Sequence, residues 1–154
     1  MSREVLVSDI MTHKVICAGL NNKLSQVLEF FTKFKIQHLP VTEDNKIVGI
    51  ISVNDILWFL NNHLQKSETI TQSYLDQAFS LESVMTKNPV TLRPDATIDE
   101  AFKLLEPGNF QCVLIAEDGN IKGILSNKDL IRYHVYGFNT DHDDFTIGAP
   151  GYGI

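Results

Sequence analysis

The sequence predicts an α+β protein built from two pseudo-symmetric β-α-β-β-α repeats that pack sheet to sheet. First, shifting the chain along itself by 74 residues aligns ten identical residues without a gap, from Met11 to Asp55 in the first copy. Second, each copy shows an amphipathic helix pattern followed by two apolar runs that a short polar turn connects. Third, a copy of about 60 residues buries too little apolar surface alone, so we expect the two copies to share one body.

In the first copy, apolar residues at three- and four-residue spacing predict a helix over residues 24–34. Two apolar runs, 36–42 and 47–52, then predict the strands of a hairpin. A second apolar stripe predicts another helix from residue 53 to residue 64.

The second copy repeats this order. Ile98 to Leu105 has the same helical spacing, and Pro107-Gly108 ends that helix early because both residues oppose helix continuation. Asp118-Gly119 between two apolar runs is a strong hairpin signal. A last helix is expected from residue 130 to residue 136.

Four segments follow from these patterns, namely a first repeat over 5–66, a connector over 67–80, a second repeat over 81–136 and a tail over 137–154. The connector is rich in Ser, Thr and Gln, and we expect one short helical turn in it. The tail contains four glycines, and we expect it to be flexible or to lie at a dimer contact. Its Asp141-His142-Asp143-Asp144 cluster is interpreted as a solvated acidic segment rather than a metal site.

Composition excludes several classes of function. The net charge of −6 disfavours binding to nucleic acid or to anionic membranes. No apolar run approaches the ~20 residues that span a bilayer, and the N-terminus lacks the apolar core of a secretory signal. Two cysteines are too few for a disulfide framework, so we expect a reducing, cytoplasmic location.

The most informative segments are Ile47–Asp55 and Ile121–Asp129, where an apolar strand passes through a glycine into Ser-x-x-Asp at a helix start. One interpretation is purely structural, because Ser-x-x-Asp resembles a capping box that satisfies free backbone N–H groups. The other is a ligand site. The glycine permits close approach to the strand, and a helix N-terminus with a hydroxyl and a carboxylate suits a phosphate and a ribose diol.

Met-Thr, a strand, a helix, a strand pair and Gly-x-x-Ser-x-x-Asp, all occurring twice, resemble a tandem pair of CBS domains, the Bateman module. The resemblance covers residues 5–136. It implies two repeats around a pseudo-two-fold axis, with two clefts that bind adenosine-containing ligands: AMP, ADP, ATP or S-adenosylmethionine. Whether Mg²⁺ accompanies a polyphosphate is left open.

Carried over residue by residue, the resemblance assigns ligand-binding residues to both clefts. The residues of one cleft are Ser52, Asn54, Asp55, Asn88, Pro89 and Val90, with Gln37 or Cys112 nearby. The residues of the other are Ser126, Lys128, Asp129, Lys14, Val15 and Ile16, with His38 and Gln111 as wall candidates. His38 stands where the family often has Arg. Because Lys128 adds a charge that Asn54 does not, the Asp129 cleft is expected to be the better site for an anion.

The resemblance therefore implies a regulatory, energy-sensing homodimer that changes conformation when a nucleotide binds and signals to an unidentified partner protein. An exposed Trp58 or Tyr133 would favour association. No P-loop, Gly-x-Ser-x-Gly motif or metal-ligand set is present, so no catalytic residue is assigned. Two alternatives remain: a structural or dimerisation module without a nucleotide ligand, and a small hydrolase or transferase.

Overall fold

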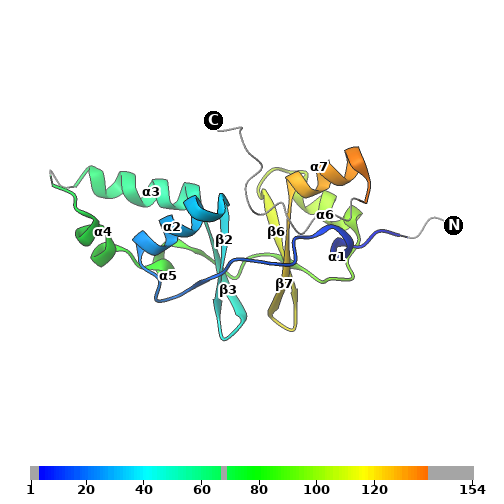
Figure 1. The fold of residues 1–154 in the computed structure, drawn as a ribbon, viewed down its shortest axis with the longest axis horizontal. Helices are drawn as coiled ribbons and strands as arrows, with labels where there is room; N and C mark the ends of the chain where they lie inside the picture. The colour runs from blue at the N-terminus through cyan, green and yellow to red at the C-terminus, as the bar shows by residue number, and fades with distance from the viewer. Residues whose placement is uncertain (1–3, 67–68, 139–154) are drawn as a thin grey trace. The chain divides into compact units, whose positions relative to one another are not determined.

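The computed structural model describes residues 4–66 and 69–138 (Figure 1). Helices and strands are interspersed along the chain, as expected for an α+β fold. Within the described residues they are α1 (Val7–Ile10), β1 (Ala18–Gly19), α2 (Leu24–Phe34), β2 (His38–Glu43), β3 (Lys46–Ser52), α3 (Val53–Leu64), α4 (Gln72–Ala78), α5 (Leu81–Val84), β4 (Thr86–Lys87), β5 (Thr91–Leu92), α6 (Ile98–Leu105), β6 (Cys112–Glu117), β7 (Asn120–Ser126) and α7 (Asn127–Tyr136).

The described residues form two compact units. The Asp55 unit comprises residues 16–66 and 69–89, and the Asp129 unit comprises residues 4–15 and 90–138. These units differ from the predicted repeats, because α1 joins the second hairpin whereas α5 and β4 join the first. Each repeat of the sequence therefore contributes its leading segment to the other repeat's hairpin.

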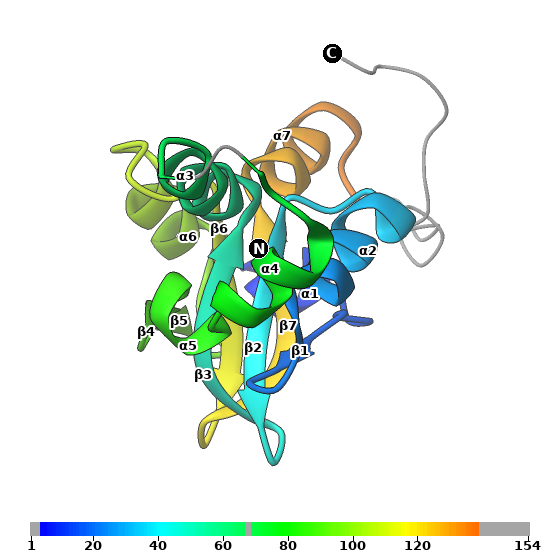
Figure 2. The ribbon, with the colours of Figure 1, turned by 90° about the vertical axis from the view of Figure 1, so that its left-hand side faces the viewer.

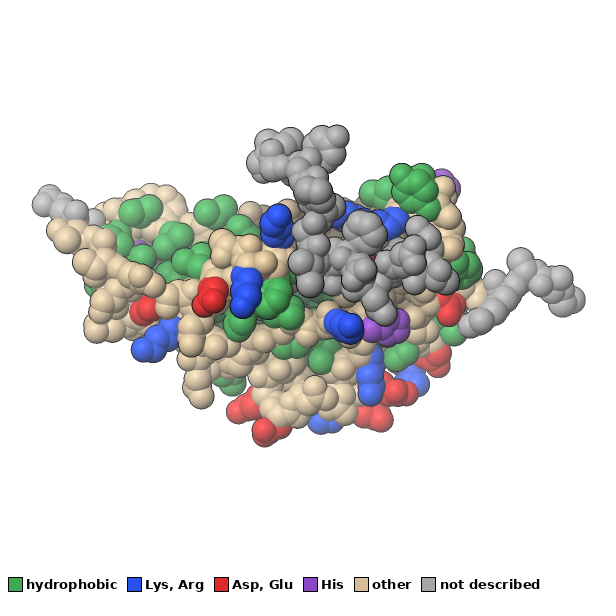
Figure 3. All heavy atoms as spheres, in the orientation of Figure 1, with side chains coloured by type: hydrophobic (Ala, Val, Ile, Leu, Met, Phe, Trp, Pro, Cys, Tyr) green, Lys and Arg blue, Asp and Glu red, His purple; other side chains and the backbone are tan. Residues whose placement is uncertain are grey.

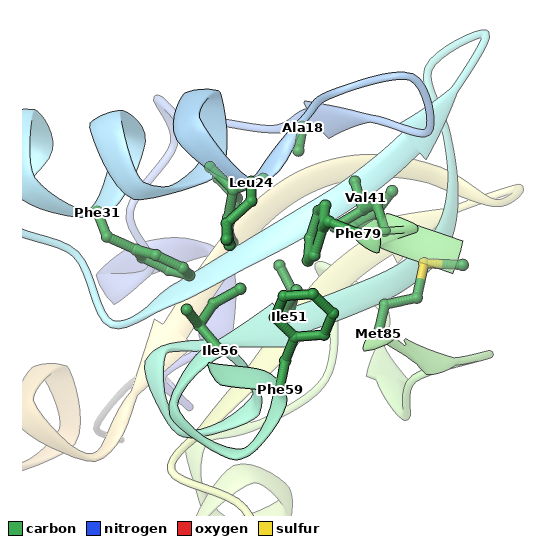
Figure 4. Close-up of a cluster of buried hydrophobic side chains, with 12 residues drawn as sticks. Ala18, Leu24, Phe31, Val41, Ile51, Ile56, Phe59, Phe79 and Met85 are labelled. Carbon is green, nitrogen blue, oxygen red and sulfur yellow. The ribbon is translucent and has the colours of Figure 1, made fainter. Parts of the chain in front are cut away.

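In the Asp55 unit, β2 is parallel to β1 and antiparallel to β3, and β4 adds an antiparallel strand on the other side of β3. Asp44 and Asn45 close the hairpin with φ values of 49° and 65°, in the left-handed region that Asp and Asn tolerate. Side chains from α2, α3, α5 and the strands form the core, part of which Figure 4 labels. Its buried residues are Ala18, Leu24, Val27, Phe31, Leu39, Val41, Ile51, Ile56, Phe59, Phe79, Leu81 and Met85.

The Asp129 unit has the corresponding plan. Strand β6 is parallel to β5 and antiparallel to β7, and Thr12 forms an antiparallel bridge with Ile124 of β7. The predicted Asp118-Gly119 turn closes the hairpin with φ values of 51° and 78°. The buried core consists of Val7, Ile10, Met11, Ala101, Leu105, Val113, Ile115, Leu125 and Leu130.

The connector contains more structure than the predicted single turn. Helix α4 runs from Gln72 to Ala78 and packs beside α2 (Figure 2). The Asp76 carboxylate accepts hydrogen bonds from the Ser25 N–H at 2.9 Å and from the Ser25 hydroxyl at 2.8 Å, in the first turn of α2. Phe79 follows in the buried core, so the connector is part of the Asp55 unit.

The segments assigned as cleft walls, residues 14–16 and 88–90, have no strand structure. Residues 14–16 lie outside the strands, and β1 is the short segment Ala18–Gly19. Within residues 4–66 and 69–138, no helix is long and apolar enough to cross a membrane, and no group of three or more His, Cys, Asp or Glu side chains could hold a metal ion. The acidic cluster over residues 141–144 lies outside the described residues.

Candidate functional site

In the Asp55 unit, Ser52 is the N-cap of α3, and its hydroxyl oxygen accepts the Asp55 N–H at 3.2 Å. The Asp55 Oδ2 atom in turn accepts the Ser52 N–H at 2.7 Å and the Ser52 hydroxyl at 2.9 Å. The predicted capping box is therefore confirmed here, with both side chains engaged.

The Asp129 unit repeats this arrangement at the start of α7. Asp129 Oδ2 accepts the Ser126 N–H at 2.8 Å and the Ser126 hydroxyl at 2.9 Å, and the Asp129 N–H donates to Ser126 Oγ at 3.3 Å. No hydrogen bond joins the other oxygen, Oδ1, of Asp55 or Asp129 to a described residue. Since both carboxylates are half-buried, each Oδ1 is left to accept from another group.

The glycine of each motif permits a close approach, as predicted, and the approaching group is the chain itself. A Cβ atom at Gly49 would overlap the Met85 side chain and lie 3.0 Å from the Thr86 carbonyl oxygen. A Cβ atom at Gly123 would overlap Met11 and lie 2.9 Å from the carbonyl oxygen of Thr12. The repeated glycine thus has a structural role in both units.

The residues opposite the two serines differ. His38 is the direct antiparallel partner of Ser52, whereas Cys112 is the partner of Ser126. The sequence analysis assigned His38 to the Asp129 motif and Cys112 to the Asp55 motif. Within each unit, the strand register places His38 beside the Asp55 motif and Cys112 beside the Asp129 motif, and the assigned roles of both residues in the clefts stay predictions.

Gln37 and Gln111 occupy matching places beside the two helix starts. The Gln37 carbonyl oxygen accepts the Val53 N–H at 3.1 Å, and the Gln111 carbonyl oxygen accepts the Asn127 N–H at 3.0 Å. Both backbones therefore help to satisfy a first turn, which leaves the two exposed side chains as wall candidates only.

Burial shifts the pKa values of His38 and Cys112 in opposite directions. Burial lowers the pKa of His38, and the negative charge of Asp55 acts against that effect. Burial, and to a lesser extent the negative charge of Asp129, together raise the pKa of the Cys112 thiol to about 12. At neutral pH, both groups are therefore mainly uncharged in the free protein.

Asn54 and Lys128 occupy the same position, one residue before the aspartate, and both are exposed. Lys128 therefore places a cationic side chain at the start of α7, where α3 has a neutral amide. Because of this difference, the Asp129 motif was predicted to be the better site for an anion. That choice stays a prediction.

The remaining predicted residues lie in two loop segments, one before β1 and one between β4 and β5. The Asn88 N–H donates to the Val48 carbonyl oxygen at 3.4 Å, so it lies beside the middle of β3 rather than at its Ser52 end. Pro89 belongs to the Asp55 unit, and Lys14 and Val15 belong to the Asp129 unit.

Two of the assigned wall residues fall in the unit opposite to their assigned motif. Val90, assigned to the Asp55 motif, lies in the Asp129 unit, and Ile16, assigned to the Asp129 motif, packs against the core of the Asp55 unit. Their roles as ligand contacts stay predictions.

Comparison with known proteins identifies the repeat. The family model for the CBS domain matches residues 7–62 and again residues 81–136. The chain belongs to the CBS domain family. As a tandem CBS pair, it carries one Ser-x-x-Asp motif in each copy.

Related sequences include the uncharacterized protein MJ1426 of Methanocaldococcus jannaschii, which is 33% identical over 83% of this chain and 90% of that protein. Others are longer. The chain spans 44% of the uncharacterized protein MJ0188 of the same organism, at 30% identity. It spans 23% of a homoserine O-acetyltransferase of Methanohalobium evestigatum, at 28% identity. The enzyme name therefore belongs to a protein in which the matching region is a minor part.

Solved structures confirm the predicted α+β fold of a CBS pair. CBSX2, crystallised in complex with AMP, has a TM-score of 0.71 and 26% identity, covering 85% of this chain and 96% of that one. The CBS pair of protein MJ0100, crystallised with 5′-methylthioadenosine and S-adenosyl-L-methionine, has a TM-score of 0.72 and 25% identity, covering 86% and 98%.

Proposed function

We propose that this CBS pair is a regulatory module that binds an adenosine-containing ligand (AMP, ADP, ATP or S-adenosylmethionine) at its Ser-x-x-Asp motifs. The observation that carries the proposal is the similarity, over 85% of this chain and 96% of the other, to a CBS pair crystallised with AMP. Both motifs are intact in this sequence, and each keeps one carboxylate oxygen without a hydrogen bond to a described residue.

The local chemistry suits such a ligand. Oδ1 of Asp55 or Asp129 can accept hydrogen bonds from a ribose diol without breaking the capping box, since the cap uses Oδ2. The start of α3 or α7 presents backbone N–H groups and the positive end of the helix dipole, which favour a phosphate. Lys128 adds a positive charge at the second motif. If the ligand is a polyphosphate, Mg²⁺ accompanies it through the phosphate oxygens.

We further propose that ligand binding shifts the population of two conformations that a partner protein distinguishes. An adenine nucleotide as the ligand would make the module an energy sensor. The module regulates rather than catalyses, and it resides in the cytoplasm, in keeping with two cysteines that form no disulfide in the described part of the chain.

The proposed homodimer has support in the exposed apolar side chains of α3 and α7. Leu57, Trp58 and Leu64 of α3 are 57%, 67% and 62% exposed, and Ile131 and Val135 of α7 are 64% and 60% exposed. Figure 3 shows hydrophobic side chains at the surface over both helices. Exposed patches of this kind are typical of association surfaces.

A structural module without a nucleotide ligand is the second candidate. The observation that favours it is the completeness of both capping boxes, since the serine and aspartate side chains have a structural role without any ligand. In that case the motifs stabilise α3 and α7 and contribute nothing else.

Thermal unfolding in the presence of AMP, ADP, ATP with and without Mg²⁺, and S-adenosylmethionine tests the proposal. A ligand at 100 times its Kd adds about 2.7 kcal/mol, which raises Tm by several degrees. We expect Asp129→Ala to lower that increase, and to cost about 1 kcal/mol in the absence of ligand through loss of the cap.

The control is Glu100→Ala, which removes a matching capping box at α6. There Glu100 Oε2 accepts the Thr97 N–H at 2.7 Å, and the Thr97 hydroxyl oxygen accepts the Glu100 N–H at 3.2 Å. This variant should lose similar stability and keep the full response to ligand. If no ligand in the panel raises Tm in the folded wild type, the proposal is wrong and the structural module stands.

A further inference from the structure

An imidazole lies beside the motif of the Asp55 unit. His38 and Ser52 are direct partners in the antiparallel β2–β3 pair, and such partners hold their Cβ atoms about 4.5–5.5 Å apart on one face of the sheet. Leu39 and Val41 alternate with His38 along β2, and both belong to the buried core. His38 therefore lies on the face away from that core, together with the Ser52 hydroxyl.

Asp55 is the titratable group that acts on His38 within the described residues of this unit. On one side of β2, Cys17 hydrogen-bonds Thr42. On the other side, Lys46 lies opposite Glu43 in the strand register. These groups lie at the far end of the strand from His38. Helix α2 packs on the opposite face, through Leu24, Val27 and Phe31.

We propose that His38 makes ligand binding at the Asp55 motif depend on pH, by taking up a proton when the bound ligand carries a phosphate. The proposal rests on the proposed function of adenosine-ligand binding. A phosphate monoester carries about −1.5 to −2 charges at pH 7. Bound at the start of α3 near the Ser52 hydroxyl, it adds its charge to that of Asp55. The imidazolium is then favoured and donates a charge-assisted N–H hydrogen bond to a phosphate oxygen.

The Asp129 motif has no equivalent switch, because Cys112 occupies the matching position opposite Ser126. The buried Cys112 thiol, with its raised pKa, stays protonated throughout the neutral range. Proton uptake is therefore specific to ligand at the Asp55 motif, and the two motifs of one chain respond to different conditions.

Proton uptake and ligand affinity are linked. A single proton taken up on binding raises affinity as pH falls, by at most tenfold per pH unit. The affinity changes over the pH range between the pKa of His38 in the free protein and its higher pKa in the complex. Adenosine, which has the base and ribose but no phosphate, should bind with an affinity that does not change over this window.

The test is calorimetric titration of the full chain with AMP and with adenosine, between about pH 6.5 and pH 8, in buffers of different ionisation enthalpy. This range lies above the second phosphate pKa of about 6, so the charge of AMP changes little. For the wild type, we expect several-fold tighter AMP binding at the lower pH, with measurable proton uptake. His38→Gln should abolish both, and His38→Arg should bind AMP with an affinity that is independent of pH.

The matched control is His134→Gln, at an exposed histidine of α7, which should keep the pH dependence of the wild type. If AMP binds and proton uptake is the same in His38→Gln as in the wild type, this inference is overturned and the proposed function stands. If S-adenosylmethionine binds and AMP does not, this inference is likewise overturned and the proposed function stands. If AMP, adenosine and S-adenosylmethionine all fail to bind, both proposals fall together. His38→Arg keeps the test decisive if His38→Gln does not fold.

Discussion

The Asp55 and Asp129 units share their caps and their glycine contacts, and they differ in the side chains around them. The Ser–Asp hydrogen bonds have nearly the same lengths in both units, and each glycine lies under a Met-Thr segment. Opposite the two serines, however, one unit has His38 and the other has Cys112. The shared features are explained by architecture alone, so a difference in ligand chemistry between the units must come from the residues that differ.

A second difference concerns an aromatic pair in each unit, between the helix that follows the Ser-x-x-Asp motif and a residue beyond the end of that helix. In the Asp55 unit, the rings of Phe59 and Phe79 meet edge to face with centroids 5.3 Å apart, and Phe79 is 8% exposed. In the Asp129 unit, Tyr133 and Phe138 have the same 5.3 Å separation, but Phe138 is 59% exposed. Similar geometry therefore coincides with very different burial.

The largest predicted effect follows from this difference. Phe79→Ala should lower the free energy of unfolding by about 3–4 kcal/mol, because it leaves a cavity in the buried core. Phe138→Ala should cost less than about 1 kcal/mol, since most of that ring stays in water. Urea unfolding followed by circular dichroism measures both. Equal losses would show that ring contact, rather than burial, determines the stabilisation.

The glycine contacts should be equally sensitive in the two units. Gly49→Ala and Gly123→Ala each place a Cβ against a methionine side chain and a backbone carbonyl oxygen, and each should cost about 1–3 kcal/mol. The control is Gly19→Ala, whose nearest neighbour would be Asn22 Oδ1 at 4.0 Å and which should change stability by less than about 0.5 kcal/mol. A large loss at one glycine only would contradict the equivalence of the two contacts.

The smallest effect concerns the thiols. Because burial raises the pKa of Cys112 to about 12, iodoacetamide at pH 8 should modify the half-buried Cys17 well before Cys112. A folded pKa above the unfolded value means that stability is retained below about pH 9 and lost as pH rises toward 12. Cys112→Ala should reduce that alkaline loss. Faster labelling of Cys112 than of Cys17, measured by mass spectrometry, would contradict the assigned burial.

Most of the secondary structure was predictable because its signals are local. The turn residues Asp118-Gly119 fix a hairpin by their tolerance of positive φ, and the helix over 53–64 has an apolar stripe at helical spacing. The capping boxes were equally visible, since Ser-x-x-Asp specifies its own hydrogen bonds.

The exchange of leading segments was not predictable, because it depends on tertiary contacts. Met11-Thr12 and Met85-Thr86 look alike, so no local pattern shows which hairpin each one joins. The length of helix α4 was underestimated for a related reason. This helix has no buried residue of its own, and it is held by the hydrogen bonds between Asp76 and Ser25, which are 51 residues apart.

The site shows the same limit. The resemblance placed His38 with the Asp129 motif and Cys112 with the Asp55 motif, whereas the strand register within each unit pairs His38 with Ser52 and Cys112 with Ser126. The roles of these residues as ligand contacts stay predictions. A strand register, which places His38 across from Ser52, is set by pairing between strands and not by the residues of either motif.

The most direct test of the central claim is calorimetric titration of AMP into the wild type, Asp55→Ala, Asp129→Ala and Glu100→Ala. The account predicts that AMP binds to the wild type, that each aspartate substitution removes binding at its own motif, and that Glu100→Ala keeps the wild-type stoichiometry and affinity. Unchanged AMP binding in both folded aspartate variants would contradict the account, because the motifs would then be helix caps and nothing more.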